Sequence, residues 1–404
     1  MKKKAVILAA GWGTRLRPLT LGRPKPAIRL LEDTLIEHNL KELSGLVEEA
    51  IIVVGYKDEI IKEKVGERFA GIKIRYVNQE EQLGTGHAAK VALPFLDDEF
   101  LILNGDDLYL REDIEKCLLK NPSILVKEIE NPEKYGQVLV KNEKIEKIVE
   151  KPKKKISNLI NIGCYHLNKS FFEKEIEKSD RGEYEIVDFL KFYIKEKNSI
   201  YAATAKNWMP VTYPWSVLEG IEKVFSKRRS KKEGIVEKGA FVKGKVITEK
   251  GSIIKRGSVV EGPVYIGKNT TIGPNTYIKG PSAIHDNCFL GAGVEIQSSV
   301  IFSGTQIPHY AFIGDSVIGE NCLIGTGVVL INFLFGGDSI WTKVKGKKIS
   351  TGREKMGTVI GNNVKIGPNV SIMPGVMIGD DTTVYPHTLV KENVEQNTKE
   401  KGKK

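Results

Sequence analysis

The chain has 404 residues, of which 41% are hydrophobic and 28% charged, and its 62 Lys and Arg against 51 Asp and Glu give a formal net charge of +11. The length exceeds that of a usual single domain, and the composition is typical of a soluble globular protein. No apolar run approaches the roughly 18 residues of a membrane span, and the run after the basic start is too short for a signal peptide, so we expect a cytoplasmic protein with no membrane partner. Because lysines and glutamates are interleaved along the chain, the positive charge favours a solvated surface, as in heat-adapted proteins, over a nucleic-acid partner.

Strand-length apolar runs alternate with helical patterns up to about residue 226. The predicted strands span residues 5–9, 51–54, 72–77 and 100–103, and the predicted helices between them span residues 35–45 and 58–69. This alternation predicts an α/β fold with a Rossmann-like, mixed and mainly parallel sheet, helices on both faces, and ligands at the carboxyl ends of the strands. We assign residues 1–226 to this first domain.

A glycine-rich segment follows the first predicted strand directly. It reads A-A-G-W-G-T-R-L-R-P-L-T over residues 9–20, and R-P-K-P follows over residues 23–26. Backbone N–H groups in such a turn, together with nearby Arg and Lys, bind polyphosphates, so the segment predicts a nucleotide site. The dinucleotide fingerprint needs a third glycine where this chain has Leu16, and the Gly-Lys-Ser/Thr of the Walker loop is absent.

These residues resemble the Gly-x-Gly-Thr-Arg, Pro-x-Thr and Pro-Lys signature of the sugar-1-phosphate nucleotidylyltransferases, of the glucose-1-phosphate thymidylyltransferase and N-acetylglucosamine-1-phosphate uridylyltransferase type. The resemblance implies a nucleoside triphosphate, UTP or dTTP, and a sugar-1-phosphate as substrates. Two catalytic residues are implied, with Arg15 facing the β- and γ-phosphates and Lys25 the α-phosphate. The implied nucleotide-binding residues are Ala10, Gly11, Gly13, Thr14, Gln79, Gly84 and Thr85.

Two later segments extend the resemblance on the nucleotide side. Residues 101–106 form an apolar run that ends in Gly-Asp, a natural way to hold a carboxylate at a sheet edge for Mg²⁺. By resemblance to the family's Gly-Asp, Asp106 is the metal ligand and a catalytic residue, and Asp107 is the less favoured neighbour. In the second segment, residues 79–87, the Gln79 amide suits the donor and acceptor edge of a pyrimidine, and we expect His87 to be structural.

Three further segments resemble the acceptor-binding motifs of the family, in the right order along the chain. The resemblance implies that Gly136 belongs to the sugar pocket and that Glu150 and Asn161 bind sugar hydroxyls. It implies that Lys151 is a catalytic residue at the sugar phosphate. Residues 182–188 also match a family segment that shapes the acceptor pocket.

One position departs from the family pattern. Where the family carries an Asp or Asn as its second metal ligand, this chain has Pro210. Mg²⁺ is then held by Asp106, the nucleotide and water, which suits an ion that keeps several waters, or catalysis is weakened.

A six-residue period begins at residue 235. Aliphatic residues, with Thr248 as the exception, recur every six positions over residues 236–296 and again over 360–390. One aliphatic and one compact side chain per six residues predict a three-sided parallel β-helix with Gly and Asn at its corners, and the pattern resembles the left-handed β-helix of hexapeptide-repeat acyltransferases. We assign residues 227–234 to a basic linker, 235–392 to the β-helix and 393–404 to a Lys-rich tail.

An insertion at about residues 331–359 interrupts the period and is rich in Lys and Arg. Insertions in a solenoid form loops that project from one face, often the binding face. Two interpretations of its charge stay open, a grip on a phosphorylated ligand and a solvated loop.

The segment 307–315 resembles a turn of the bifunctional enzymes that also acetylate glucosamine-1-phosphate. There a histidine acts as general base on the sugar amine, which implies a role for His309, with Asn332, in a site for acetyl-CoA. Three positions depart from that family, where a Lys, a Tyr and another Lys are replaced by Gln297, Phe312 and Asp338.

The four cysteines form no C-x-x-C pair, and no histidine lies at metal-binding spacing from them. We therefore expect buried structural thiols rather than disulfides or metal ligands.

The sequence as a whole is similar to archaeal bifunctional nucleotidylyltransferase/acetyltransferases. It predicts in-line, Mg²⁺-assisted attack of a sugar-1-phosphate, of the glucose or N-acetylglucosamine type, on the α-phosphate, giving a nucleotide-sugar and pyrophosphate. Two alternatives stay open: an enzyme that also acetylates an amino-sugar-1-phosphate, and a non-catalytic regulatory subunit that binds sugar nucleotides. Because such β-helices commonly trimerise in the family, we expect a homo-oligomer, a trimer or a multiple of one. Base and sugar are read by pocket shape, which no motif specifies.

Overall fold

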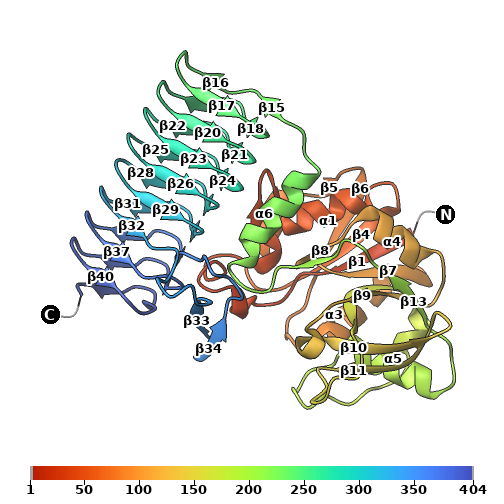
Figure 1. Ribbon diagram of the computed structural model, residues 1–404. Coiled ribbons are helices and arrows are strands. Elements are labelled where there is room, and N and C mark those ends of the chain that lie inside the picture. The colour runs from red at the N-terminus through yellow and green to blue at the C-terminus, as the bar shows by residue number, and fades with distance from the viewer. Residues whose placement is uncertain (1–2, 403–404) are drawn as a thin grey trace. The chain divides into compact units, whose positions relative to one another are not determined.

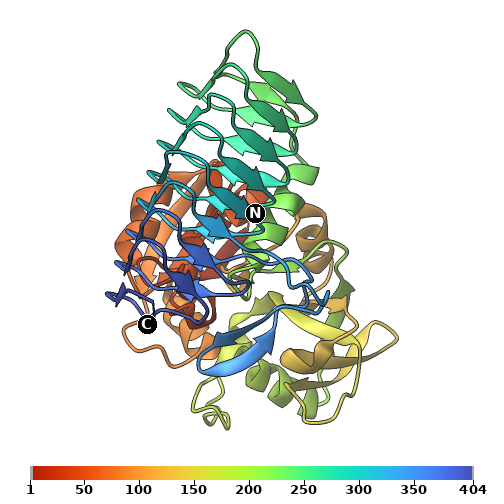
Figure 2. The ribbon, with the colours of Figure 1, turned by 60° about the vertical axis from the view of Figure 1, so that its left-hand side comes forward.

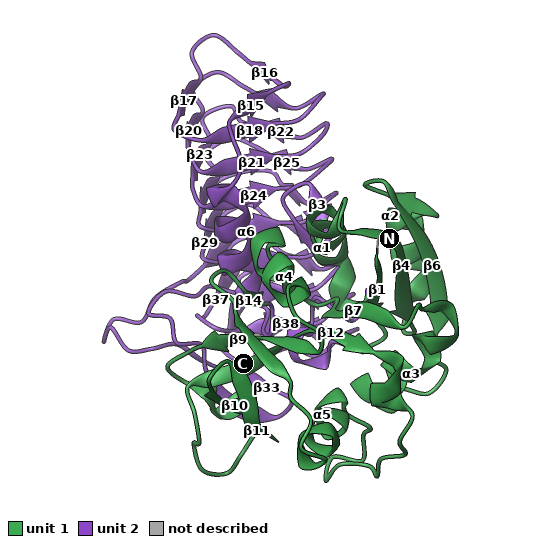
Figure 3. Ribbon diagram, turned by 90° about the vertical axis from the view of Figure 1, so that its right-hand side faces the viewer, with its two compact units in different colours: residues 1–12, 24–27, 34–210 green, residues 13–23, 28–33, 211–404 purple. Residues whose placement is uncertain are grey.

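The computed structural model describes residues 3–402, and the chain divides into two compact units (Figure 3). Unit 1 comprises Met1–Trp12, Pro24–Ala27 and Thr34–Pro210. Unit 2 comprises Gly13–Arg23, Ile28–Asp33 and Val211–Lys404. Two short segments near the start of the chain therefore group with its C-terminal part.

Unit 1 is built on a ten-stranded sheet with the order β10-β11-β13-β9-β12-β7-β1-β4-β6-β5 (Figure 1). The central strands β7, β1, β4 and β6 are parallel, as the alternation of strands and helices predicts. Strand β12 runs antiparallel to its neighbours β7 and β9, so the half of the sheet beyond β7 is mostly antiparallel. The strands are β1 (Lys3–Leu8), β4 (Val47–Val54), β5 (Arg68–Phe69), β6 (Ile72–Asn78), β7 (Glu99–Asn104), β9 (Ser123–Glu128), β10 (Gly136–Lys141), β11 (Lys144–Glu150), β12 (Leu159–Asn168) and β13 (Tyr201–Thr204).

Helices cover both faces of this sheet, as expected. Successive side chains of a strand point to opposite faces, and Ala5 and Ile7 of β1 share a buried cluster with residues of α1, α2 and α4. Val6 shares a second cluster with residues of α3 and α5. These helices are α1 (Leu35–Leu43), α2 (Asp58–Val65), α3 (Thr85–Ala92), α4 (Arg111–Leu118) and α5 (Ile186–Lys195).

Helices α1 and α2 end a few residues before the predicted positions 45 and 69. A left-handed glycine closes each end, since φ is +80° at Gly45 and +68° at Gly66. Glycine adopts this conformation at little cost and is the usual residue after a helix C-terminus. The following Arg68–Phe69 forms β5 instead of a last helical turn.

Unit 2 contains a β-helix whose coils stack on three parallel sheets (Figure 2). The first sheet holds β15 (Lys231–Lys232), β18 (Val246–Thr248), β21 (Val264–Ile266), β24 (Ser282–Ile284), β27 (Val300–Ile301), β30 (Val317–Ile318), β35 (Val359–Ile360) and β38 (Met377–Ile378). The second holds β16 (Ile235–Val236), β19 (Ile253–Ile254), β22 (Thr271–Ile272), β25 (Phe289–Leu290), β28 (Gln306–Ile307), β31 (Leu323–Ile324), β36 (Lys365–Ile366), β39 (Thr383–Val384) and β41 (Lys399–Glu400). The third holds β17 (Phe241–Lys243), β20 (Val259–Glu261), β23 (Tyr277–Lys279), β26 (Glu295–Gln297), β29 (Phe312–Gly314), β32 (Val329–Leu330), β37 (Ser371–Ile372) and β40 (Leu389–Val390).

The aliphatic positions of the six-residue period line the core of this β-helix. Ile278 and Ile296 are fully buried members of one continuous cluster that extends to Val394. The period is not uniform, because Ile284 pairs with Ile301 and Ile301 with Ile318, which makes these two coils one residue shorter than their predecessors. The first coil also differs, since Val236 is 40% exposed where a core position is expected. An end coil has a neighbour on one side only, which explains this exposure.

Further elements belong to unit 2. Helix α6 (Ser216–Ser226) packs on this unit, where Gly220 lies against the Leu30 side chain. The insertion after β32 forms a hairpin of β33 (Trp341–Val344) and β34 (Lys347–Ser350). Strands β15 and β41 lie in the segments predicted as linker and tail and pair with β18 and β39. The remaining short strands are β2 (Arg29–Leu30), β3 (Asp33–Thr34), β8 (Asp107–Leu108) and β14 (Met209–Pro210).

All four cysteines are buried and unpaired, as expected. Burial raises the pKa of the Cys288 and Cys322 thiols to about 12, so both stay protonated and unreactive at neutral pH. Over residues 3–402, no helix combines the length and apolar character that a membrane crossing requires.

Candidate active site

The nucleotide motif starts where β1 ends. Leu8 lies opposite Val53 of β4 and Asn104 of β7, so three parallel strands end at one sheet edge. Just beyond, the Ala9 N–H donates to the Val53 carbonyl and the Gly105 N–H donates to the Leu8 carbonyl, both at 2.9 Å. Open α/β sheets bind their ligands at this edge.

The backbone around Gly11 is open to a ligand. A Cβ added to Gly11 would meet no atom within 4 Å, whereas Ala10 before it is buried. The half-exposed Trp12 ring packs on Tyr56, with ring centroids 4.7 Å apart. A phosphate group can therefore approach these main-chain N–H groups closely.

The loop Gly13–Arg23 folds on its own hydrogen bonds within unit 2. Gly13 is left-handed, with φ of 59° and ψ of 26°, and precedes a short 3-10 helix over Thr14–Leu16. The Thr20 hydroxyl and the Leu16 N–H both donate to the Gly13 carbonyl, at 2.9 Å. Leu16 is buried beneath the loop, while the Arg15 side chain is exposed and available to an anion.

Lys25 and Asp106 form a close ion pair in unit 1. The Lys25 Nζ lies 2.7 Å from the Asp106 Oδ2 and 3.8 Å from the Asp107 Oδ1. The Lys25 side chain is only 9% exposed, whereas that of Asp106 is 40% exposed. A buried ammonium requires such a partner, and the exposed carboxylate retains lone pairs for another cation.

Asp107 is held more tightly than Asp106. Its side chain is largely buried and accepts a hydrogen bond from the Trp208 Nε1 at 3.3 Å, and its carbonyl accepts one from the Asn39 Nδ2 at 2.8 Å. Pro210 of β14 pairs with Asp107 of β8, so the position that departs from the family pattern lies next to the two carboxylates. Asp106 is the better placed of the two for a soluble ligand.

Within residues 3–402, no group of three or more His, Cys, Asp and Glu side chains is placed to hold a metal ion. The residues present nevertheless fit Mg²⁺, because this ion is usually bound by one or two carboxylates with water and substrate phosphates. The half-exposed Asp106 carboxylate supplies such a ligand.

The predicted base-reading residues lie together. The Gln79 Nε2 donates to the Gly84 carbonyl and contacts the His87 Nδ1, both at 3.1 Å. Gln79 itself is 4% exposed, so these contacts fix the orientation of its amide. His87 thus lies beside the Gln79 amide, and its structural role stays a prediction.

Residues 183–186 pack against the segment that starts at Gly84 and leave no space there for a side chain. At Gly84, where φ is +104°, an added Cβ would come 2.9 Å from the Glu183 Cβ and close to the Tyr184 backbone. The Tyr184 N–H donates to the Leu83 carbonyl at 2.7 Å, and the Ile186 N–H donates to the Thr85 hydroxyl at 3.3 Å. The segment to which the sequence assigns no more than a shaping role therefore supports the start of α3 and the candidate base pocket.

The predicted sugar residues gather on β10, β11 and β12. Gly136 pairs with Glu150, and a Cβ on Gly136 would come 2.7 Å from the Glu150 Oε2 and 3.8 Å from the Asn161 Cβ. The Asn161 amide is fixed at both ends, since its Nδ2 donates to the Tyr165 hydroxyl at 2.8 Å and its Oδ1 accepts from the Gly163 N–H at 3.1 Å. These contacts bring the three candidate sugar residues into one group.

Lys151 and Arg181 add positive charge beside Glu150. Their distances to the Glu150 Oε1 are 3.0 Å from the Lys151 Nζ and 3.5 Å from the Arg181 Nη2. Arg181 also pairs with the buried Glu185 at 2.7 Å. Burial raises the pKa of Glu185, but hydrogen bonds from Arg181 and Ser179 and the charges of Arg181 and Lys151 lower it to below its ordinary value.

The sequence prediction missed Arg181. It immediately precedes the segment 182–188 that matches the family, and this adjacency is the signal that could have found it. Two basic residues beside the partly buried Glu150 suit a phosphate monoester next to sugar hydroxyls.

The two candidate acetyltransferase residues lie at different corners of the β-helix in unit 2. His309 is exposed and follows β28 of the second sheet, whereas Asn332 follows β32 of the third sheet. Asn332 is 6% exposed, and its Nδ2 donates to the Asp315 Oδ2 at 2.7 Å. Arg353 from the insertion pairs with Asp315 at 3.7 Å and with Glu219 at 3.5 Å. At least this cation of the basic insertion is thus held by carboxylates of its own unit.

Family profiles match almost the whole chain. The profile of the nucleotidyl transferase family matches residues 4–226. A profile described as the GMPPB C-terminal domain matches residues 260–356, and the bacterial transferase hexapeptide profile, with six repeats, matches residues 357–392. These matches confirm the two predicted kinds of structure, the α/β fold and the hexapeptide β-helix.

Full-length relatives occur in archaea. The chain is 42% identical over 401 residues to a Bifunctional protein GlmU of Methanococcus maripaludis strain C7, covering 98% of this chain and 96% of that protein. It is 38% identical over 406 residues to a bifunctional sugar-1-phosphate nucleotidylyltransferase/acetyltransferase of Sulfurisphaera tokodaii, covering 97% and 98%. A crystal structure of UDP-glucose pyrophosphorylase complexed with UDP-glucose shares the fold, with a TM-score of 0.50 and 24% identity over 56% of this chain and 100% of that chain.

Proposed function

The chain belongs to the nucleotidyl transferase family, and we propose that it is a sugar-1-phosphate nucleotidylyltransferase whose nucleotide substrate is UTP or dTTP. In the proposed reaction an oxygen of the sugar phosphate bonds to the α-phosphorus of the triphosphate. The bond from that phosphorus to the bridging oxygen breaks at the same time, so pyrophosphate leaves.

The ion pair of Lys25 and Asp106 is the observation that carries this proposal. Without substrate, Asp106 neutralises the buried Lys25 at 2.7 Å, which avoids an unpaired buried charge. A triphosphate offers Lys25 a stronger anionic partner at the α-phosphate and releases the Asp106 carboxylate. Mg²⁺, when bound at Asp106, would neutralise charge on the phosphates.

The other candidate residues take roles that match their surroundings. The exposed Arg15 contacts the β- and γ-phosphates, and Gln79 reads the base with its amide held in place. The Glu150 carboxylate accepts hydrogen bonds from sugar hydroxyls, and the Asn161 amide can both accept and donate them. Lys151 binds the sugar phosphate. Catalysis on this proposal rests on positioning and charge, with no covalent intermediate on the protein.

Pyrophosphate release from a panel of substrates tests the proposal. UTP and dTTP are each combined with glucose-1-phosphate and N-acetylglucosamine-1-phosphate, with and without Mg²⁺. We expect Mg²⁺-dependent release with at least one pair, and its loss in Lys25→Ala. Lys62→Ala is a matched control, because Lys62 pairs with Asp58 on an exposed turn of α2. Absence of release with every pair contradicts the proposal and favours a regulatory subunit that binds sugar nucleotides.

We also propose a second activity, acetyl transfer from acetyl-CoA to an amino-sugar-1-phosphate, because His309 projects from a corner of a hexapeptide β-helix with no ion pair of its own among the described residues. Thiol release from acetyl-CoA with glucosamine-1-phosphate measures it. We expect thiol release by the parent chain and its loss in His309→Ala. His387→Ala is the matched control, since His387 is an exposed histidine at the corresponding corner of a later coil.

A homo-oligomer, a trimer or a multiple of one, is proposed for the assembly. Exposed apolar side chains on the outer faces of the β-helix support it, among them Leu323 at 44% and Leu389 at 46% exposure, since a partner would cover them. Light scattering at micromolar concentration decides this, and a monomer mass contradicts it.

A further inference from the structure

The β-helix carries a row of corner turns with a shared form, between the sheet of β18 and the sheet of β19. Each turn has four residues, and the third is left-handed, with φ between 53° and 76°, at Asn269, Asn287, Gly304, Asn321 and Asn363. The second residue is acidic or an amide in four of these turns, at Asp286, Glu320, Asn362 and Asp380. This series is named the acidic row here.

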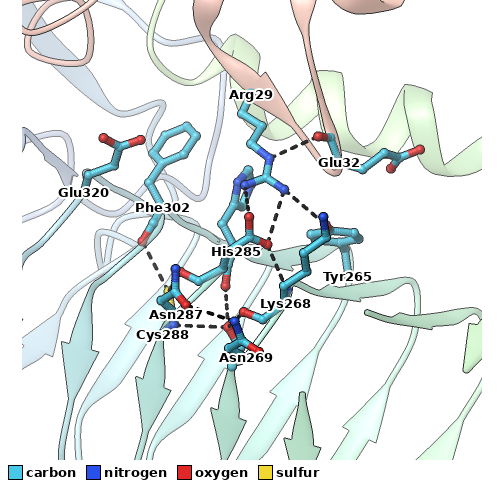
Figure 4. A network of polar contacts seen from close by, with 12 residues as sticks. Arg29, Glu32, Tyr265, Lys268, Asn269, His285, Asn287, Cys288, Phe302 and Glu320 are labelled. Atoms are coloured by element: carbon cyan, nitrogen blue, oxygen red, sulfur yellow. Dashed lines mark hydrogen bonds and ion pairs between the residues drawn. The ribbon is translucent and has the colours of Figure 1, made fainter. Parts of the chain in front are cut away.

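Two arginines from the start of the chain, Arg29 and Arg23, bind the acidic row within unit 2, and Figure 4 shows the contacts of Arg29. The Arg29 Nη1 lies 2.7 Å from the Asp286 Oδ2, and its Nη2 lies 3.3 Å from both the Asp286 Oδ1 and the Tyr265 hydroxyl. The Arg29 Nε donates to the Glu32 carbonyl at 3.2 Å. A two-point contact with a carboxylate fixes the orientation of a guanidinium as well as its position.

Arg23 makes a similar two-point contact two turns further along. Its Nη1 and Nη2 lie 2.8 Å from the two carboxylate oxygens of Glu320, and its Nη2 also donates to the Asn362 Oδ1 at 3.1 Å. The Arg23 guanidinium lies 5.4 Å from the centre of the Phe302 ring, within reach of a cation–π contact. Gly22 approaches so closely that an added Cβ would come 2.9 Å from the Asn362 Nδ2.

The turns beneath these arginines are specialised. The first residue of neighbouring turns is glycine, because a Cβ there would collide with the next coil, as at Gly267 and Gly361. His285 and Phe302 replace that glycine in the turn of Asp286 and in the next turn along the β-helix, and their rings are 5.0 Å apart. Neither ring nitrogen of the fully buried His285 has a hydrogen-bond partner among the described residues.

His285 acts as a neutral packing surface in this arrangement. Burial lowers the pKa of His285 well below its ordinary value, and the charges of Arg29 and Arg23 lower it further. The imidazole stays uncharged beside two cations and presents an aromatic face, as Phe302 and Tyr265 do. The β-helix therefore provides carboxylates that pair with the charges of the arginines, and aromatic rings that lie beside their planar guanidinium groups.

We propose that Arg23 and Arg29 are positioning residues for nucleotide binding, which tether the loop Gly13–Arg23 to the β-helix. This inference rests on the proposed function, since the loop bears Arg15, the candidate ligand of the β- and γ-phosphates. The two arginines flank Pro24–Ala27, the segment that carries Lys25. Ordering a free loop costs conformational entropy, and a loop already held in place avoids that cost on binding.

Binding and turnover are measured on full-length Arg23→Gln and Arg29→Gln. We expect the Kd and KM for UTP or dTTP to rise about tenfold, as loss of loop preorganisation predicts, while the KM for the sugar-1-phosphate changes by less than about twofold. Lys231→Gln removes an ion pair with Glu249 elsewhere on the same β-helix, and we expect it to leave all these constants unchanged. Charge exchange, Arg23→Glu combined with Glu320→Arg, should recover most of the lost affinity.

Three results would contradict the proposed tether. Unchanged nucleotide affinity in both arginine variants overturns the tether, and so does a failure of charge exchange when thermal unfolding shows the double variant folded. Equal loss of affinity for both substrates also overturns it, because that result indicates general destabilisation. Titration calorimetry with UTP and dTTP reads the tether without turnover, so absence of pyrophosphate release contradicts the proposed function alone.

Discussion

Replacement of Lys25 by glutamine separates the charge of this side chain from its packing. Glutamine keeps half of the methylene groups of the lysine stem and a polar, uncharged end, but leaves Asp106 without its cation at 2.7 Å. Because the Asp106 side chain is 40% exposed, water screens most of the lost attraction, and we expect unfolding free energy to fall by about 1 kcal/mol. For a unit of this size that is a shift of roughly 2–4 °C in Tm.

The expected effect on catalysis is much larger. Removing one preorganised group that stabilises transition-state charge lowers turnover by about 10²–10³-fold, or about 2.7–4 kcal/mol. Pyrophosphate release under saturating substrates measures it, beside differential scanning calorimetry of the same sample. The exposed pair of Lys62 with Asp58 provides the control Lys62→Gln, for which we expect neither change. A loss of turnover below about fivefold, or one accompanied by unfolding at the assay temperature, refutes the electrostatic role of Lys25.

Three further predictions concern the sugar pocket, the β-helix core and an acid-sensitive carboxylate. Glu150→Gln raises the KM for the sugar-1-phosphate by about tenfold or more and leaves the KM for the nucleotide unchanged; equal changes in both constants contradict its assignment to the sugar. Ile278 is fully buried, so Ile278→Ala lowers the free energy of unfolding by about 2–5 kcal/mol and Ile278→Val lowers it by about 0.5–1.5 kcal/mol. Urea denaturation measures both changes, and equally small effects of the two substitutions would mean that the core is loosely packed there. Burial raises the pKa of Asp113, but hydrogen bonds from Lys116 and two backbone N–H groups lower it below its ordinary value. Its stabilisation is therefore present above the unfolded pKa of about 3.9 and is lost as pH falls through the lower folded value, so Asp113→Asn should destabilise at pH 7 and progressively less under more acid conditions.

Local pattern was sufficient for the β-helix and for the parallel centre of the sheet. A six-residue period repeats the same demand for one buried aliphatic side chain, and Ile278 and Ile296 fulfil it. The same period does not reveal that a corner has lost one residue, as between Ile284 and Ile301. Such a deletion shifts later positions without changing the kind of residue at each.

The residues of the candidate site likewise divide into those that a local motif reveals and those that it does not. Local pattern revealed Gly11 and Asp106 because each lies just beyond an apolar strand, and Lys25 because it belongs to the R-P-K-P motif. Arg181 was missed, since its partner Glu150 lies on a distant strand and the adjacent segment 182–188 was the one local signal for it. The antiparallel direction of β12 relative to β7 and β9 likewise depends on contacts between residues that lie far apart in the chain.

The sequence by itself determined the two architectures, the family and the residue types of the nucleotide site, because strand period, turn glycines and motif spacing are properties of neighbouring residues. Only the tertiary structure decided that Gly13–Arg23 packs with the β-helix, and that Arg23 and Arg29 find Glu320 and Asp286 there. Arginine near a glycine-rich loop suits a phosphate and a carboxylate equally well. Which anion it meets is settled by the fold, which brings a carboxylate from some 250 to 300 positions away to within hydrogen-bond distance.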